Sequence, residues 1–252
     1  MINDILLALQ FLTIIPIKIA KVDDKSIARS LIYYPLIGLL LGAILVAGLA
    51  LLLVLNFLMM PVSIILVVLL IIFTGGLHLD GLSDTFDALL SRKPRKEMLQ
   101  IMRDSHAGAL GIVAVICVIL LKIAFIFSLN PASKIVGLML MCVLSRWSMV
   151  FSIFLFPYAR KEGKAKVYSE GITPRIFTFA TILVLVCSFL IAKSNGIFVF
   201  GLSALGSYAI SKFFSHKLGG ITGDTLGATN EIAEVIVLLC ICVLGRTGLW
   251  IT

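Results

Sequence analysis

The stretch LIYYPLIGLLLGAILVAGLALLLVLNF, Leu31–Phe57, carries no charged side chain anywhere along its length. A helix needs about 20 apolar residues to cross the hydrocarbon core of a bilayer, so this stretch predicts a membrane-spanning helix. Six further apolar runs follow it: Pro61–Phe73, Leu110–Leu129, Ile135–Phe156, Ile176–Ala192, Ile197–Phe214 and Ile232–Trp250. The second of the seven runs is short unless Thr74–Leu79 continues it inside the protein.

The composition agrees with a membrane protein. Of the 252 residues, 60% are hydrophobic and 13% are charged, whereas soluble domains carry about 25% charged residues. The opening segment, residues 1–17, is apolar but short and lacks a basic start, so it predicts an interfacial helix ending near Pro16 rather than a cleaved signal peptide. The sequence therefore predicts an all-α, polytopic integral membrane bundle of about seven transmembrane helices plus this N-terminal interfacial helix, with residues 1–252 forming a single domain.

The net charge of +8 is distributed unevenly about the predicted membrane. Four basic residues precede the first run, five follow the second, five separate the fourth from the fifth, and two lie near the connection from the sixth to the seventh. The opposite side has Lys134 and Lys193. Cytoplasmic segments of membrane proteins carry an excess of Lys and Arg. This pattern predicts a multi-pass protein of the cell (inner) membrane, with anionic lipid or substrate phosphates rather than nucleic acid as partners.

Two acidic stretches stand out, GGLHLDGLSDTFDALL (Gly75–Leu90) and GGITGDTLGATNEIAEV (Gly219–Val235). A carboxylate at the centre of a membrane helix costs about 2.5–3.5 kcal/mol, so clustered acids must face water, a cation or one another. On a helix, Asp80, Asp84 and Asp87 would form one stripe. Their oxygens suit Mg²⁺, with Mn²⁺ as the second choice. The alternative is a solvated helix face, which leaves the flanking glycines unexplained.

The second stretch combines glycines, hydroxyls and acids. A glycine-rich backbone at a helix N-terminus favours a phosphate, and Asp224 and Glu231 would hold the metal of that phosphate. The alternative is an ordinary capped entry into the last helix. The residues of this stretch expected to bind substrate are Gly219, Gly220, Thr222 and Gly223.

Further polar residues lie between the two stretches. Asp104 and His106, at the start of the third predicted helix, are candidates for a ligand or a general base. The alternative is that Asp104 and Ser105 form an N-cap pair. An arginine inside a membrane run marks a function or a buried ion pair. The candidate substrate-binding residues in this part of the chain are Arg103, Ser105, His106 and Arg146.

With these residues assembled, the chain resembles the cobalamin (5′-phosphate) synthase family along nearly its whole length. The motifs that carry the resemblance are FLTIIPI (Phe11–Ile17), YYPLIGLLLG (Tyr33–Gly42), GGLHLDGLSDTFDAL, MRDSHAGALG, SRW, PYAR-x-EG and GGITGDTLGA. The chain departs from the family pattern at Ser83, Phe86 and Ala88, where small residues or glycine are usual.

The resemblance implies an integral membrane enzyme that joins adenosylcobinamide-GDP to α-ribazole or its 5′-phosphate, releases GMP and requires Mg²⁺. The asymmetry of basic residues places both acidic stretches on the cytoplasmic side, so the active site would face the cytoplasm. Asp84, Asp80 and Asp104 are the expected catalytic residues, and the expected metal ligands are Asp80, Asp84, Asp87, Asp224 and Glu231.

Other functions and partners stay open. The main alternative is an ion-coupled membrane transporter with buried carboxylates. A CDP-alcohol phosphotransferase also uses an Asp-rich helix, but no Ala-Arg pair follows Asp84, as that family requires. The sequence is compatible with membrane lipid as a partner, and with a homo-oligomer or contact with other cobalamin-assembly enzymes.

Overall fold

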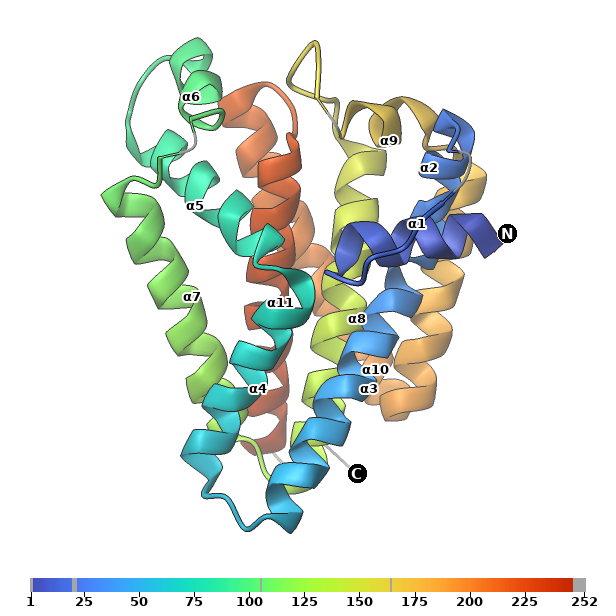
Figure 1. Ribbon diagram of the computed structural model, residues 1–252, viewed down its shortest axis with the longest axis vertical. Helices are drawn as coiled ribbons and strands as arrows, with labels where there is room; N and C mark the ends of the chain where they lie inside the picture. The colour runs from blue at the N-terminus through green and yellow to red at the C-terminus, as the bar shows by residue number, and fades with distance from the viewer. Residues whose placement is uncertain (1, 20–21, 105, 164, 247–252) are drawn as a thin grey trace.

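The computed structural model describes residues 2–19, 22–104, 106–163 and 165–246 and is helical throughout (Figure 1). Within these residues the structure has no strand, and the predicted all-α fold is confirmed. The helices are α1 Ile2–Leu12, α2 Asp24–Ser30, α3 Tyr34–Val54, α4 Met59–Thr74, α5 Leu77–Leu90, α6 Arg95–Ile101, α7 Ala109–Ser128, α8 Pro131–Leu155, α9 Lys166–Gly171, α10 Pro174–Leu218 and α11 Gly223–Arg246, with a 3₁₀ turn, η1, at Leu31–Tyr33.

Five helical segments are long and apolar enough to cross a membrane. They are Asp24–Val54, α7, α8, α10 and Gly223–Gly245 of α11. A sixth is reached if α4 and α5 count as one span, although α5 turns away from α4 by 91°. The structure thus agrees with the prediction of a multi-pass helical membrane protein.

The longest helix, α10, is two helices joined at a break. Ala192 and Lys193 leave helical geometry, and Lys193 has a φ of +52°. Phe177 before the break and Phe200 after it both contact the ring of Trp147, so the two halves fold back side by side. This break separates the two apolar runs that the sequence shows as distinct. All seven predicted runs therefore lie in helical segments as far as residue 246.

Helix α8 forms the centre of the bundle and packs against α3, α10 and α11. Its residues from Leu138 to Val150 are almost all buried. Close packing depends on glycine, because a Cβ at Gly38 of α3 would overlap the Cys142 carbonyl oxygen of α8. Such close approach of backbones is typical of helix pairs in membranes.

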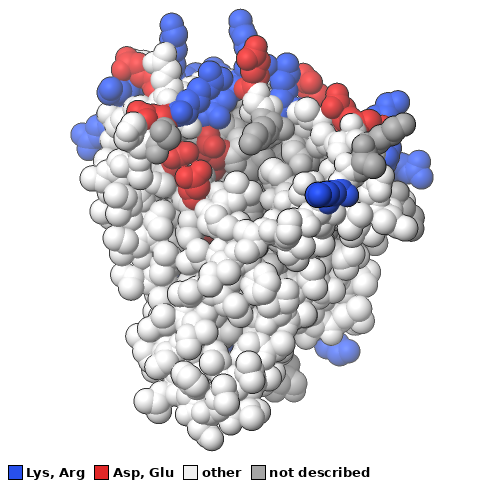
Figure 2. Space-filling view, viewed as in Figure 1, with Lys and Arg blue, Asp and Glu red and all other residues white. Residues whose placement is uncertain are grey.

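The charged side chains gather at one end of the molecule, the end that carries α6 and α9 (Figures 1 and 2). The rest of the face shown in Figure 2 is nearly free of charge. This distribution follows the asymmetry of basic residues in the sequence. We refer to this end as the charged end.

Candidate active site

The acidic helix α5 reaches the charged end through a double-glycine turn. Gly75 and Gly76 both have left-handed backbone, with φ values of +62° and +68°, a conformation that glycine adopts without steric cost. The turn ends α4 and sends α5 away at 91°. The stretch that begins at Leu77 therefore crosses the end of the bundle, where it packs against α7 and α11.

Helices α5 and α11 meet at glycines. A Cβ at Gly81 would lie 2.7 Å from the backbone oxygen of Asp224, and a Cβ at Gly227 would lie 3.1 Å from the backbone oxygen of His78. Because neither residue has a side chain, the two backbones touch. This contact brings the acids of α5 beside Asp224 of α11.

Four carboxylates and one guanidinium share this region. Asp84 interacts electrostatically with Asp80, Asp87 and Asp224, and with Arg160. The Arg160 Nη2 atom lies 2.7 Å from Oδ2 of Asp224. Within the described residues, no three His, Cys, Asp or Glu side chains converge as a ready-made metal cage. The carboxylates lie near one another along facing helices and repel, which favours binding of a cation.

Asp87 has a structural role that the sequence did not predict. Its two carboxylate oxygens accept hydrogen bonds from the backbone N–H groups of Gly108 and Gly111, each at 2.8 Å. These groups lie at the N-terminus of α7, where a negative charge is stabilised by unpaired N–H groups and the helix dipole. Both oxygens of Asp87 thus fix α7 against α5, and its assignment to the metal set stays a prediction.

Replacing Asp87 by alanine should lower the stability of the folded protein by about 1–2 kcal/mol, the range for a lost helix cap. The reason is that two N–H groups of α7 lose their acceptor. The loss is measured as the fall in melting temperature of the purified protein. Asp23→Ala is the matched variant for comparison, because it removes the cap of the peripheral helix α2. A melting temperature unchanged in Asp87→Ala would contradict the capping role.

The glycine-rich start of the second acidic stretch also has a structural role. Gly219, with a φ of +70°, ends α10, and Gly220 packs against the Pro157 carbonyl oxygen. Ile221 N donates to Pro157 O, and Ala159 N donates to Ile221 O, both at 2.8 Å. These glycines therefore build a turn against the segment that follows α8, and neither lines the cavity described below. Their role as substrate ligands stays a prediction.

Of the remaining two residues of that stretch, Thr222 has a structural role and Gly223 lies at the cavity. Thr222 is fully buried, and its hydroxyl accepts the Thr225 N–H at 3.1 Å, as the cap of α11. Thr222 thus acts as an ordinary helix cap, which is the alternative that the sequence offered for this stretch. Of the four predicted substrate ligands in this stretch, only Gly223 lines the cavity described below.

Glu231 and Arg146 lie in a buried network of charges. Lys122 of α7 bonds Glu231 at 2.6 Å and also bonds Glu234, which pairs with Arg146 of α8. All four side chains are at least nine-tenths buried. We call these four residues the core charge network. Arg146 thus forms the buried ion pair that the sequence offered as its alternative, and the roles of Glu231 as a metal ligand and of Arg146 as a substrate ligand stay predictions.

The loop between α6 and α7 is exposed. Asp104 Oδ1 lies 2.6 Å from Nδ1 of His106, and each shifts the other: the hydrogen bond lowers the pKa of Asp104 and raises the pKa of His106. Ser105 lies outside the described residues. Arg103 interacts electrostatically with Tyr158, one of the residues that line the cavity described below. Its role as a phosphate ligand stays a prediction, as do the roles of Asp104 and His106.

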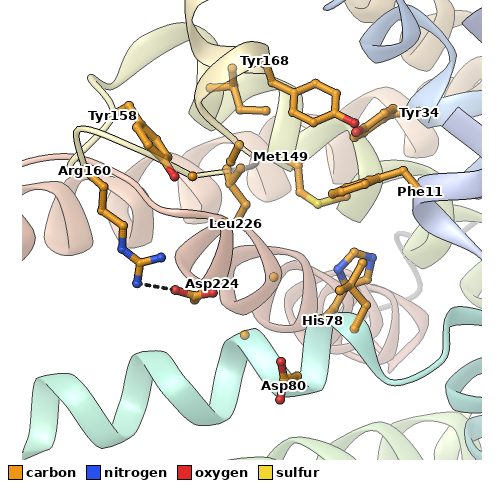
Figure 3. Close-up of a pocket in the computed structure, with 17 residues that line it drawn as sticks. Phe11, Tyr34, His78, Asp80, Met149, Tyr158, Arg160, Tyr168, Asp224 and Leu226 are labelled. Carbon is orange, nitrogen blue, oxygen red and sulfur yellow. Dashed lines mark hydrogen bonds and ion pairs between the residues drawn. The ribbon is translucent and has the colours of Figure 1, made fainter. Parts of the chain in front are cut away.

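A cavity of about 240 Å³ opens between α5, α8, α11 and the segment after α8 (Figure 3). One end is polar and is lined by Asp80, Arg160 and Asp224. The other end is lined mainly by aromatic and apolar side chains: Phe11, Tyr34, Met149 and Tyr168 (Figure 3). The cavity thus combines an acidic end suited to a phosphate-bound cation with an apolar end suited to a ring.

Comparison with known proteins points to one enzyme family. The sequence matches the family described as cobalamin-5-phosphate synthase over residues 4–242. It is 36% identical to a protein of Desulforamulus reducens over 96% of both chains, and 36% identical to one of Thermodesulfovibrio yellowstonii over all of both chains. A protein of Clostridium acetobutylicum is 34% identical over 94% of both chains. All three are named adenosylcobinamide-GDP ribazoletransferase. No solved structure matches the chain.

Proposed function

The chain belongs to the cobalamin-5-phosphate synthase family, and we propose that it joins adenosylcobinamide-GDP to α-ribazole, or to α-ribazole 5′-phosphate, with release of GMP. A ribose hydroxyl of the acceptor attacks the phosphorus that bears the cobinamide. The bond from this phosphorus to the bridging oxygen of the diphosphate breaks, GMP leaves with that oxygen, and the hydroxyl proton passes to a base. The observation that carries the proposal is the cavity whose polar end joins carboxylates of α5 and α11 to Arg160.

The donor set at this end fits a hard divalent cation such as Mg²⁺ or Mn²⁺. The carboxylates that would hold it are those of Asp80, Asp84 and Asp224, brought together by the glycine contact between α5 and α11. Mg²⁺ is usually held by one or two carboxylates together with substrate phosphates, so a complete protein cage is not required. When bound, the cation would neutralise the charge on the diphosphate.

The protein's own residues would accept the proton and bind the phosphate oxygens. Asp84 is half-buried among other acids, which suits a base that accepts the proton of the ribose hydroxyl. Arg160 holds Asp224 in place, and its Nε atom has no hydrogen-bond partner within the described chain. That free N–H can donate to a phosphate oxygen, as can the exposed Arg103.

The site lies at the charged end of the bundle, which we assign to the cytoplasmic side of the cell membrane. The basic residues collected there support this orientation. The apolar outer faces of helices such as α7 and α10, where large hydrophobic side chains are exposed, would contact membrane lipid.

The direct test supplies purified protein with adenosylcobinamide-GDP and α-ribazole and measures GMP and the cobalamin product. The two products should form in equal amounts, and GMP release should require α-ribazole. GMP release at the same rate without the acceptor would indicate a hydrolase and would sink the proposal. Parallel reactions with α-ribazole 5′-phosphate decide which acceptor is preferred.

Removal of divalent cations is expected to reduce turnover at least a hundredfold, because the diphosphate and the facing carboxylates would then repel. Turnover after thorough chelation, with and without added Mg²⁺ or Mn²⁺, measures this effect. The melting temperature of the chelated protein serves as the control for unfolding. Activity that survives chelation unchanged would refute the metal proposal.

The transporter alternative relies on carboxylates buried within the membrane-spanning part. The buried acids of α11, Glu231 and Glu234, are each bonded to Lys122, so their charges are already compensated. Reconstituted vesicles provide the discriminating test, since a transporter would move a solute across the bilayer without producing GMP.

A further inference from the structure

We propose that the aromatic end of the cavity is the binding site for the planar base of the acceptor nucleoside. This inference rests on the proposed function and assigns one half of the cavity to one substrate. The residues that form this end come from separate parts of the chain: Phe11 from α1, Tyr34 from α3 and Tyr168 from α9. We call these three rings the aromatic trio.

The aromatic trio is arranged around the cavity rather than packed shut. The ring centroids of Phe11 lie 6.1 Å from Tyr34 and 5.4 Å from Tyr168, and the two tyrosine rings meet edge to face at 6.3 Å. Protein interiors are normally filled to crystal-like density. Phe11 is 36% exposed, whereas Tyr34 and Tyr168 are 1% and 8% exposed. The open space therefore offers mainly the Phe11 ring, backed by the two tyrosines, as a surface for another planar group.

The chemistry of this end selects among the three ring systems in the reaction. Guanine presents several donors and acceptors at its edge, which need polar partners. Phe11 and Met149 offer none, and the hydroxyls of Tyr34 and Tyr168 are hydrogen-bonded to each other. The corrin with its amide arms is far larger than a cavity of about 240 Å³. The base of α-ribazole is a bicyclic, dimethylated and mostly apolar ring. It matches an aromatic and methionine-lined space in size and polarity.

His78 supplies an independent observation between the two ends of the cavity. Its side chain is only 2% exposed, and its Nε2 atom has no hydrogen-bond partner within the described residues. Figure 3 shows the ring lying between Asp80 on one side and Phe11 and Tyr34 on the other. A buried polar atom without a partner is costly, and a ribose hydroxyl or ring oxygen would satisfy it.

The order of groups along the cavity follows the order of groups in a nucleoside. The base lies against the aromatic trio, the ribose beside His78, and the attacking hydroxyl near the acids of α5 and α11. The same placement leaves the cobinamide and guanosine parts of the other substrate outside the aromatic end, toward Arg160 and the cavity mouth.

The test uses Phe11→Leu, which removes the ring but keeps an apolar side chain, and Tyr168→Leu as a second variant. With adenosylcobinamide-GDP saturating, the KM for α-ribazole should rise about tenfold or more, as expected when a stacking ring is lost. The kcat and the KM for adenosylcobinamide-GDP should stay within about twofold. Phe198→Leu, on the exposed face of α10, is the matched control and should leave both KM values unchanged.

Two further measurements separate this inference from the proposed function. Calorimetric titration of α-ribazole into the protein without the second substrate should show binding that Phe11→Leu weakens, whether or not turnover occurs. Inhibition by GMP should be unaffected in both trio variants. Weakened GMP inhibition would place guanine at the aromatic end and overturn the inference. Equal increases in both KM values together with a lower melting temperature would show a merely structural role and would overturn it as well.

Discussion

Replacing Lys122 by methionine is expected to destabilise the folded protein by about 3–5 kcal/mol, the range for breaking a buried ion pair on one side. Its ammonium lies 2.6 Å from Glu231 Oε2, also bonds Glu234, and is the link between these two acids. The lysine side chain is 3% exposed. Without it, one buried negative charge would have no compensating cation, and charges in that position are expensive.

The effect is measured by thermal unfolding of the purified protein in one detergent. Lys96→Met, which removes an exposed charge on α6, is the control and should have the melting temperature of the wild type. The double variant Lys122→Met, Glu231→Gln restores charge balance and should recover much of the loss. A single variant that melts with the wild type, or a double variant no better than the single, would contradict this account of the core charge network.

The helices were predictable because membrane spans depend mainly on composition and length. An uncharged run such as Leu31–Phe57 has few structural options in a bilayer, since only a helix satisfies its backbone groups locally. The break in α10 was also visible, because polar residues from Lys193 to Asn195 separate two apolar runs. Local sequence thus determined most of the fold.

The different roles of the individual acids could not be predicted from the sequence. Asp84 and Asp87 share one helix face, and spacing alone treats them alike. Asp87 differs because α7 begins beside it, which is a long-range contact. Glu231 was grouped with Asp224 by helical periodicity, but Lys122 faces it from α7. The lone lysine in an apolar run was a signal, since buried charges need partners, yet its partner depends on how α7 and α11 are rotated.

The role of Arg160 was not predicted from the sequence. It lies in the PYAR motif, after the end of α8, and gave no sign of pairing with an acid 64 residues later. Gly219 and Gly220 were predicted to bind a phosphate because they precede a helix N-terminus, and their contact with the segment after α8 could not be seen in the sequence. Their positive φ values and their contact with Pro157 bring Arg160 to Asp224, so they support the site indirectly.

Replacing Asp84 by asparagine is expected to lower turnover by about 10²–10⁴-fold, the contribution of a positioned general base. Asparagine keeps the shape of the side chain but removes its charge and its ability to accept a proton. Folding should be preserved, because Asp84 is repelled by Asp80, Asp224 and Asp87, and removal of one like charge relieves that repulsion. Glu97→Gln, on the exposed α6 helix, is the matched control.

We propose that the facing acids of α5 and α11 form the active site of a ribazole transfer reaction. The most direct measurement is the rate of GMP release by purified Asp84→Asn protein, with both substrates and Mg²⁺ saturating. The account predicts a loss of at least a hundredfold, while the melting temperature and the Glu97→Gln rate stay at wild-type values. A folded Asp84→Asn protein that releases GMP at the wild-type rate would contradict it.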